Sequence, residues 1–157
     1  DKKFSVPEKA ATIDQNGCIY IPHVLGVQVG QKIEILNSDG TLHNVHAMPK
    51  KKNNDAFNEA MPGARKKVTK QFDEAEVMVK MKCDVHPWMG AFIGVLDHPF
   101  FSVTDDKGNF EIENLPPGTY NVEAWHERLP AQVVTVTVKA DGDATADFIL
   151  KRPPKKK

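Results

Sequence analysis

Apolar and polar residues alternate along much of the chain. The clearest examples are Lys32–Leu36 and Glu76–Lys82, in which every second side chain is apolar. Successive side chains of a strand point to opposite faces, so this pattern predicts half-buried strands. Shorter apolar runs at Cys18–Ile21, Val27–Val29 and Ala91–Leu96 are also expected to be strands. No stretch long enough for a stable helix has a helical period, so we predict a nearly all-β fold.

Residues 49–70 interrupt this pattern and are expected to form a long polar connection, in which Ala56–Met61 makes one helical turn at most. The connection is locally basic, because only Asp55 and Glu59 oppose its positive charges. Those charges are Lys50, Lys51, Lys52, Arg65, Lys66, Lys67 and Lys70. Two interpretations stay open: a loop that steers an acidic partner, or a solvated segment that keeps the protein soluble.

Turn signals become frequent after His98. The segments Thr104–Phe110 and Leu115–Tyr120 each contain a turn motif rich in Gly, Asp or Pro, and we expect each to join two strands. Further strands are predicted in three apolar-rich segments of this region. They are Tyr120–Trp125, Val133–Val138 and Ala144–Leu150.

These patterns predict two domains, residues 1–97 and residues 98–150. The second is a small antiparallel β unit of about 50 residues, which is thin for an independent sandwich, so it is expected to pack on the first. Residues 151–157 consist only of Lys, Arg and Pro and are expected to be a disordered basic tail.

Composition restricts the function classes. Of the 157 residues 40% are hydrophobic and 27% are charged, and 21 Lys and Arg balance 21 Asp and Glu. The balance predicts no nucleic-acid partner. The longest uncharged apolar stretch, Gly90–Leu96, is too short to span a bilayer, so no transmembrane segment is expected. No nucleophile elbow, zinc-protease helix or phosphate-binding glycine loop is present, which argues against a hydrolase.

Candidate metal ligands gather between two predicted strands. Cys83, His86 and Met89 are spaced three residues apart and offer a thiolate, an imidazole and a thioether. His43 and His46 follow an earlier strand and its Asn37–Asp39 turn. A His₂Cys set with a weak axial Met is the donor arrangement of a blue-copper electron-transfer site, whereas a closed zinc site normally has four Cys or His donors.

These motifs resemble those of cupredoxins of the plastocyanin and amicyanin type. The resemblance covers roughly residues 15–97 and includes several short motifs besides the ligand loop. They are Tyr20-x-Pro22, Val27-x-Val29 with Gly30, Ile33–Leu36 with Asn37 and Asp39, His43-Asn44-Val45-His46, and Cys83-x2-His86-Pro87-x-Met89. The resemblance implies a Greek-key β-sandwich or barrel that holds one copper ion per chain. It also implies His43, Cys83 and His86 as equatorial ligands and Met89 as the axial one.

The same resemblance implies that Asn44 ties the two ligand loops together and supports the ligand sulfur. The implied function is outer-sphere transfer of single electrons, without enzymatic activity. The implied partner is a cytochrome or a periplasmic oxidoreductase that docks near His86 and Trp88. The resemblance further implies a periplasmic or extracytoplasmic protein from which a signal peptide has been removed.

Cys18 lies outside the cupredoxin pattern and leaves alternatives open. It is expected to share a strand face with Tyr20, which the resemblance places near the copper end of the barrel. Three alternatives follow: a buried thiol, a disulfide partner of Cys83, or an additional ligand of a purple or binuclear centre. The disulfide would make the protein a non-metal β-sandwich module for binding or assembly. Additional ligation by His46, His98 or His126 would favour copper storage or an oxidoreductase.

The C-terminal unit resembles carboxypeptidase regulatory-like, or transthyretin-like, domains. The resemblance rests on Val103-Thr104-Asp105-x-x-Gly108-x-Phe110 and on Leu115-Pro116-Pro117-Gly118-Thr119-Tyr120. These motifs are turn signals, so they indicate a fold rather than a function.

Overall fold

The computed structural model of the protein describes residues 4–153, and all of its regular elements are strands. The prediction of an all-β fold is confirmed. Eleven strands occur in the described chain. They are β1 (Ala11–Gln15), β2 (Tyr20–Ile21), β3 (Val24–Gln28), β4 (Ile33–Asn37), β5 (His43–Met48), β6 (Phe57–Met61), β7 (Lys67–Lys70), β8 (Glu76–Lys82), β9 (Gly90–Leu96), β10 (Gly118–Ala124) and β11 (Gln132–Val138).

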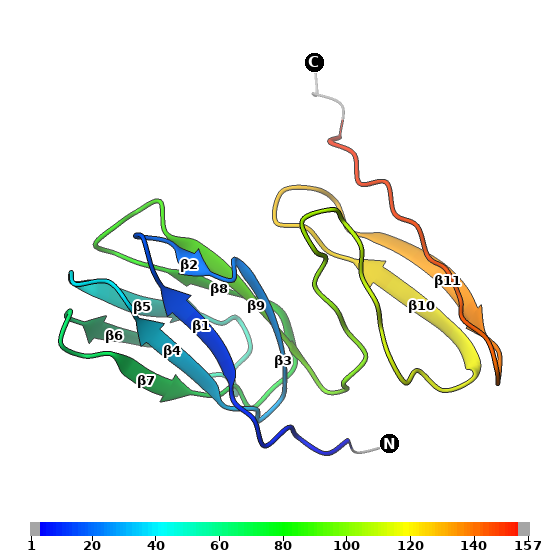
Figure 1. Ribbon diagram of the computed structural model, residues 1–157, viewed down its shortest axis with the longest axis horizontal. Coiled ribbons are helices and arrows are strands. Elements are labelled where there is room, and N and C mark those ends of the chain that lie inside the picture. Colours follow the sequence, from blue (N-terminus) through cyan, green and yellow to red (C-terminus); the bar gives the residue numbers. More distant parts are fainter. Residues whose placement is uncertain (1–3, 154–157) are drawn as a thin grey trace. The chain divides into compact units, whose positions relative to one another are not determined.

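The first nine strands form two sheets (Figure 1). One sheet has the order β2-β1-β4-β7, and the other has the order β3-β9-β8-β5-β6. Both sheets are mixed, because β1 pairs with β4 and β3 pairs with β9 in parallel, whereas the other pairs are antiparallel. These crossovers join strands that are distant in sequence into a Greek-key-like sandwich.

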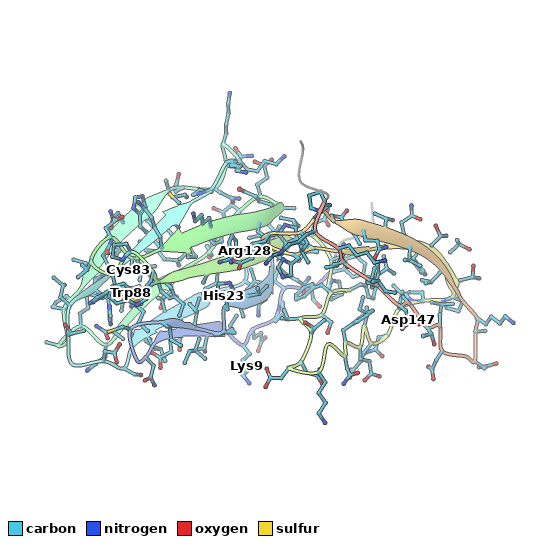
Figure 2. The ribbon with its side chains drawn as sticks, turned by 90° about the horizontal axis from the view of Figure 1, so that it is seen from above. Lys9, His23, Cys83, Trp88, Arg128 and Asp147 are labelled. Atoms are coloured by element: carbon cyan, nitrogen blue, oxygen red, sulfur yellow. The ribbon has the colours of Figure 1, made fainter. Side chains whose placement is uncertain are left out.

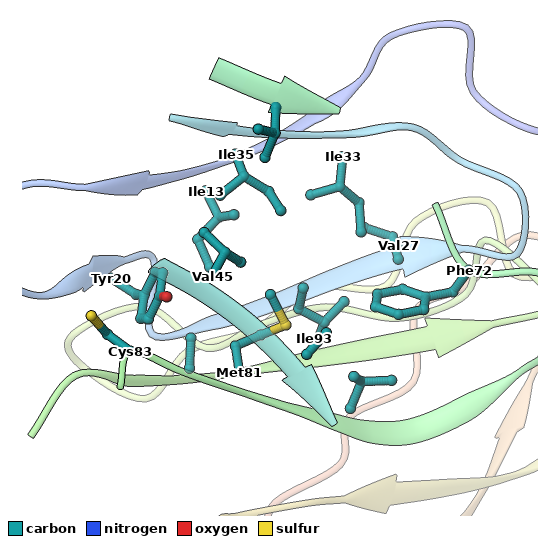
Figure 3. Close-up of a cluster of buried hydrophobic side chains, with 14 of the residues drawn as sticks. Ile13, Tyr20, Val27, Ile33, Ile35, Val45, Phe72, Met81, Cys83 and Ile93 are labelled. Atoms are coloured by element: carbon teal, nitrogen blue, oxygen red, sulfur yellow. The ribbon is translucent and has the colours of Figure 1, made fainter. Parts of the chain in front are cut away.

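The core lies between the two sheets (Figure 3). Ile13 and Ile35 extend from β1 and β4 toward Val45, Met81 and Ile93 of the other sheet, and all five side chains are buried. Removing such side chains from water supplies the main driving force for folding, at about 1.5–3 kcal/mol for each large aliphatic residue.

Two strands of the larger sheet bring candidate ligands to the same end of this core. In β5 the alternate residues His43, Val45 and Ala47 are completely buried, so His43 faces the core. In β8 Met81 is buried, and Cys83 continues the same phase just beyond the strand end. Strand periodicity therefore directs an imidazole and a thiol into the interior.

The expected connection at residues 49–70 is only partly a loop. It contains β6, which pairs with β5, and β7, which pairs with β4, so the expectation of a helical turn at Ala56–Met61 is wrong. Pairing with existing strands outweighs the weak local preference. Much of the positive charge is also neutralised, by the ion pairs Lys51–Glu74, Arg65–Glu59, Lys67–Glu34 and Lys70–Glu59.

Other local expectations are corrected as well. Cys18 does not share a strand with Tyr20: it lies in the turn between β1 and β2 with φ of 56°. Thr104–Phe110 contains the expected turn, closed by a Gly108 N–H to Asp105 O bond of 3.0 Å, but has no flanking strands. Ala144–Leu150 is also irregular. The alternation in these short segments lacks a neighbouring strand to pair with.

The described residues divide into two compact units, one ending at Glu111 and one beginning at Ile112. In the second unit β10 and β11 form a regular antiparallel hairpin, in which Gly118 is opposite Val138 and Ala124 is opposite Gln132. The predicted domain boundary between residues 97 and 98 stays a prediction. Lys151–Pro153 are irregular, and the rest of the expected tail, 154–157, lies outside the described residues. Within residues 4–153 no helix has the length and hydrophobicity needed to cross a bilayer.

Glu76, at the start of β8, organises the loop that follows β5. Its buried carboxylate accepts hydrogen bonds from the N–H groups of Lys50 and Lys51, at 2.8 and 3.1 Å, and from the Asn54 amide at 3.2 Å. Burial raises the pKa of this carboxyl, but the three donors outweigh that effect and the net pKa is lowered. The ionised form therefore stabilises the fold.

We predict that Glu76→Gln lowers the free energy of unfolding at pH 7 by about 1–3 kcal/mol, because it removes a charged acceptor from three donors. A carboxyl whose pKa is lowered by folding stabilises the protein above its unfolded pKa, and this contribution is lost as pH falls through the folded pKa. Chemical denaturation between pH 7 and pH 3 should therefore show the gap between wild type and variant closing in acid. Glu34→Gln is the control: it removes an exposed ion pair with Lys67, so its difference in unfolding free energy from wild type should be smaller. A difference between E76Q and wild type that does not change with pH would contradict the prediction.

Candidate metal centre

The candidate ligands come from two places in the larger sheet. His43 begins β5, whereas Cys83 and His86 belong to the short loop between β8 and β9. His43 and Cys83 are almost completely buried, and His86 is partly exposed. Figure 2 shows Cys83 and Trp88 near each other at one end of the first unit, and Figure 3 shows Cys83 beside Tyr20 at the end of the core.

Three donor atoms of these residues surround one small space. The His43 Nδ1 atom lies 3.0 Å from the His86 Nδ1 atom, and the Cys83 Sγ atom lies 4.0 and 3.9 Å from these two nitrogens. Metal bonds of about 2.0 Å to nitrogen and about 2.3 Å to sulfur separate neighbouring donors by about 3–4 Å. The three residues therefore fit a metal ion with little movement, and they do so through the same nitrogen of each ring.

Asp39 orients the buried imidazole. Its Oδ2 atom lies 2.8 Å from the Nε2 atom of His43. The backbone N–H groups of Cys18 and Gly17, followed by the His43 side chain, lower the pKa of Asp39 to about 2. An ionised carboxylate has no proton to donate, so Nε2 of His43 carries a proton, and in the neutral ring the Nδ1 lone pair faces Cys83 and His86.

The position of the proton on His43 also determines which nitrogen of His86 acts as the hydrogen-bond donor in the metal-free protein. When the Nδ1 atom of neutral His43 is the acceptor, the Nδ1 atom of His86 must be the donor in their 3.0 Å hydrogen bond. A metal ion would replace that proton between the two nitrogens. This contact thus holds the two rings with their Nδ1 atoms facing each other, an orientation in which both could bind one metal ion.

Asn44 connects the two ligand-bearing segments. Its Oδ1 atom accepts the Asp84 N–H, and its Nδ2 group donates to the Asp84 carboxylate at 2.9 Å. Tyr20 adds a second connection, because its hydroxyl lies 3.0 Å from the Asn44 carbonyl and 3.1 Å from that of Lys82. Burial raises the pKa of Tyr20, so the phenol stays protonated and can donate.

Cys18 lies at the same site. A ligand atom of each of Cys18, His43 and His86 falls within 4.8 Å of the others. Both Cys18 and Cys83 are free thiols, so the alternative of a Cys18–Cys83 disulfide is not realised in this structure. The residue pattern left three fates of Cys18 open, because its position depends on a turn rather than on the alternation of a strand.

The other histidines proposed as additional ligands have different surroundings. His46 is on the opposite face of β5 from His43, and its Nδ1 atom pairs with Asp84 at 2.9 Å. Lys82 first, and then His46, lower the pKa of Asp84 well below its usual range. His98 and His126 each accept a backbone N–H two residues further along. In the described chain the cluster of candidate donors includes none of the three.

Met89 and Trp88 complete the ligand loop. Met89 is buried, and its backbone bonds to His86 O at 2.9 Å and to Cys83 N at 3.3 Å close the loop. Its role as an axial ligand stays a prediction. Trp88 is 68% exposed, as expected, and its ring centroid lies 5.2 Å from that of His86.

Comparison with known sequences supports the expectation for the C-terminal region. Residues 84–151 match the profile of the family described as carboxypeptidase regulatory-like domain. The match begins inside the ligand loop and therefore includes β9 as well as the second unit. The resemblance inferred from the turn motifs is confirmed. No curated protein matches the chain.

The similar solved structures include cupredoxins. A Cu(I) form of an amicyanin variant is 25% identical over 57% of this chain and 85% of its own, with a TM-score of 0.49. An oxidised amicyanin variant has the same identity, coverage and TM-score. A purple cupredoxin from Nitrosopumilus maritimus is 22% identical over 54% of this chain and 98% of its own, with a TM-score of 0.44.

We predict that Asn44→Ala loosens the ligand loop, because it leaves the Asp84 N–H without its side-chain acceptor. The free energy of unfolding should fall by about 1–3 kcal/mol. Hydrogen exchange followed by NMR should show a faster rate at Asp84 in metal-free protein. Asn58→Ala, which removes only side-chain partners, is the matched control. An unchanged Asp84 exchange rate in N44A would show that Asn44 does not hold the loop.

Proposed function

We propose that the protein binds one copper ion and carries single electrons between redox partners. The observation that supports this most directly is the triangle of two Nδ1 atoms and one Sγ atom, with edges of 3.0, 3.9 and 4.0 Å. In the proposed centre His43, Cys83 and His86 are the equatorial ligands and Met89 is the axial one. A trigonal His₂Cys set with a weak thioether is characteristic of copper electron-transfer sites.

Bound copper would supply a centre that alternates between Cu(I) and Cu(II). The protein contributes a fixed set of donors: β5 and β8 are paired in one sheet, and Asn44 and Tyr20 connect their ends. Donors held in one arrangement move little when an electron arrives. All four proposed ligands are protein side chains, so no position is kept open for a substrate, which favours a carrier over an enzyme.

The partly exposed His86 is the proposed path for the electron. Apolar side chains next to site residues in the sequence could contact a partner around it: Ile19, Leu42, Val85 and Trp88 are 49%, 47%, 44% and 68% exposed. We propose a small, transient docking surface for a cytochrome or a periplasmic oxidoreductase. Because four basic side chains of residues 49–70 are ion-paired, electrostatic steering should be weaker than the sequence alone indicates.

The resemblance of the ligand loop to that of amicyanins leads us to place this role in the periplasm or another extracytoplasmic space. Copper storage is less well supported, because His46 is committed to Asp84 and His98 accepts a local N–H group.

We predict that one equivalent of Cu(II), added to reduced metal-free protein, produces an intense visible sulfur-to-copper band and a Cu(II) EPR signal that ascorbate abolishes. Cys83→Ser should lose at least half of the band's intensity, because serine cannot supply the thiolate. His98→Ala is the matched control and should keep both signals. Wild-type protein that binds copper without such a band, or binds none, would overturn the proposed function.

We also predict that Asp39→Asn weakens copper binding about 10- to 100-fold, because His43 loses the charged acceptor that orients its ring. Competition with a chelator of known affinity measures the change, and the folded state is checked by thermal unfolding. Asp14→Asn is the control, since Asp14 binds Ser38 in the same turn without touching His43. Equal affinities of D39N and D14N would show that Asp39 does not position the ligand.

A further inference from the structure

A second thiol lies beside the same two imidazoles. Cys18 is grouped with His43 and His86 by ligand atoms within 4.8 Å of one another, and Cys83 contacts the same two rings at 4.0 and 3.9 Å. Both thiols are free. Each of the two sulfurs therefore lies near the same two imidazoles, although the two thiols come from different segments.

The position of Cys18 is set by the residues that position the histidines. The carboxylate of Asp39, which holds His43, also accepts the Gly17 N–H at 2.9 Å and the Cys18 N–H at 3.0 Å. From the other side, the indole N–H of Trp88 donates to the Cys18 carbonyl at 3.0 Å. The turn carrying Cys18 is thus fixed to both ligand segments.

The backbone at Cys18 also has an unusual conformation. Its φ of 56° lies in the left-handed region, which non-glycine residues adopt rarely and only when the surroundings hold them there. The Asp39 and Trp88 contacts provide that restraint. The conformation keeps the Cys18 thiol close to the rings of His43 and His86.

The geometry points to Cys18 as a second thiolate ligand, so that the centre is Cys₂His₂; this inference rests on the proposed function. Donors around a tetrahedral ion with bonds of about 2.0–2.3 Å are separated by about 3.3–3.8 Å. The ligand atoms of Cys18, His43 and His86 lie within 4.8 Å of one another, so these three donors would have to approach by about 1.5 Å at most. In this centre Cys18 takes the fourth position, which the proposed function gives to Met89, and His43, Cys83 and His86 keep their roles.

A second thiolate has two chemical consequences. It adds a negative charge at the metal, which favours Cu(II) over Cu(I), so the reduction potential is lower than with a neutral thioether. It also makes the donor set suitable for Zn(II) or Co(II), which four Cys and His donors bind well. Both consequences can be measured without a partner protein.

The test uses Co(II), which does not oxidise thiols, with the reduced full-length protein. Two ligating thiolates should give a sulfur-to-cobalt charge-transfer band that falls to about half in Cys18→Ser and to about half in Cys83→Ser. Ile21→Ser, an exposed change in the neighbouring strand β2, is the matched control and should keep the full band. Thermal unfolding of each metal-free variant establishes that it is folded.

The outcomes separate this inference from the proposed function. A band that is unchanged in C18S and lost in C83S overturns the role of Cys18 and leaves a single-thiolate copper site intact. No cobalt or copper binding by wild type overturns both. As a second measurement, Cys18→Ala should raise the reduction potential of the copper protein. An unchanged potential, or the loss of two free thiols to a disulfide when Cu(II) is added, also contradicts ligation by Cys18.

Discussion

The hydrogen-bonded pairing of β5 with β8 is the constraint on which the rest of the candidate centre depends. In each strand alternate side chains point into the core. The antiparallel pairing places His43, at the start of β5, next to Cys83, just beyond the end of β8. The core residues Val45 and Met81 lie on the same inward-facing sides of β5 and β8 as these two donors. Core packing and ligand placement therefore depend on the same register: a shift of either strand by one residue would turn the donor and the core side chains of that strand outward.

A second level of organisation is polar and lies outside the core. Asp39 connects His43 to the turn of Cys18, and Asn44 connects β5 to the loop that carries Cys83 and His86. These contacts use charged or amide groups with several partners, so each fixes more than one segment. Such outer contacts decide the orientation of a ligand ring, which strand pairing alone leaves free to rotate.

Part of this structure could be predicted from residues alone. The alternation in β4 and β8 identified buried strands, and the spacing of Cys83 and His86 indicated a ligand loop, because both signals are local. The strand β6 was missed, since its pairing with β5 overrides a weak local pattern. The site of Cys18 could not be foreseen either: it depends on a turn held by Asp39 and Trp88, which lie 21 and 70 residues away along the chain.

A site for electron transfer has a stricter requirement than a site that only binds a metal, because the same donors must bind both oxidation states. In this protein the two imidazoles already face each other at 3.0 Å through the nitrogens that would bind the metal in the proposed centre, so these rings would need little rearrangement. The buried His43 is fixed by a carboxylate, whereas His86 is partly exposed beside an indole. In the proposed centre one ring would therefore be the buried anchor and the other would lead to the surface, a division of roles that follows from their burial.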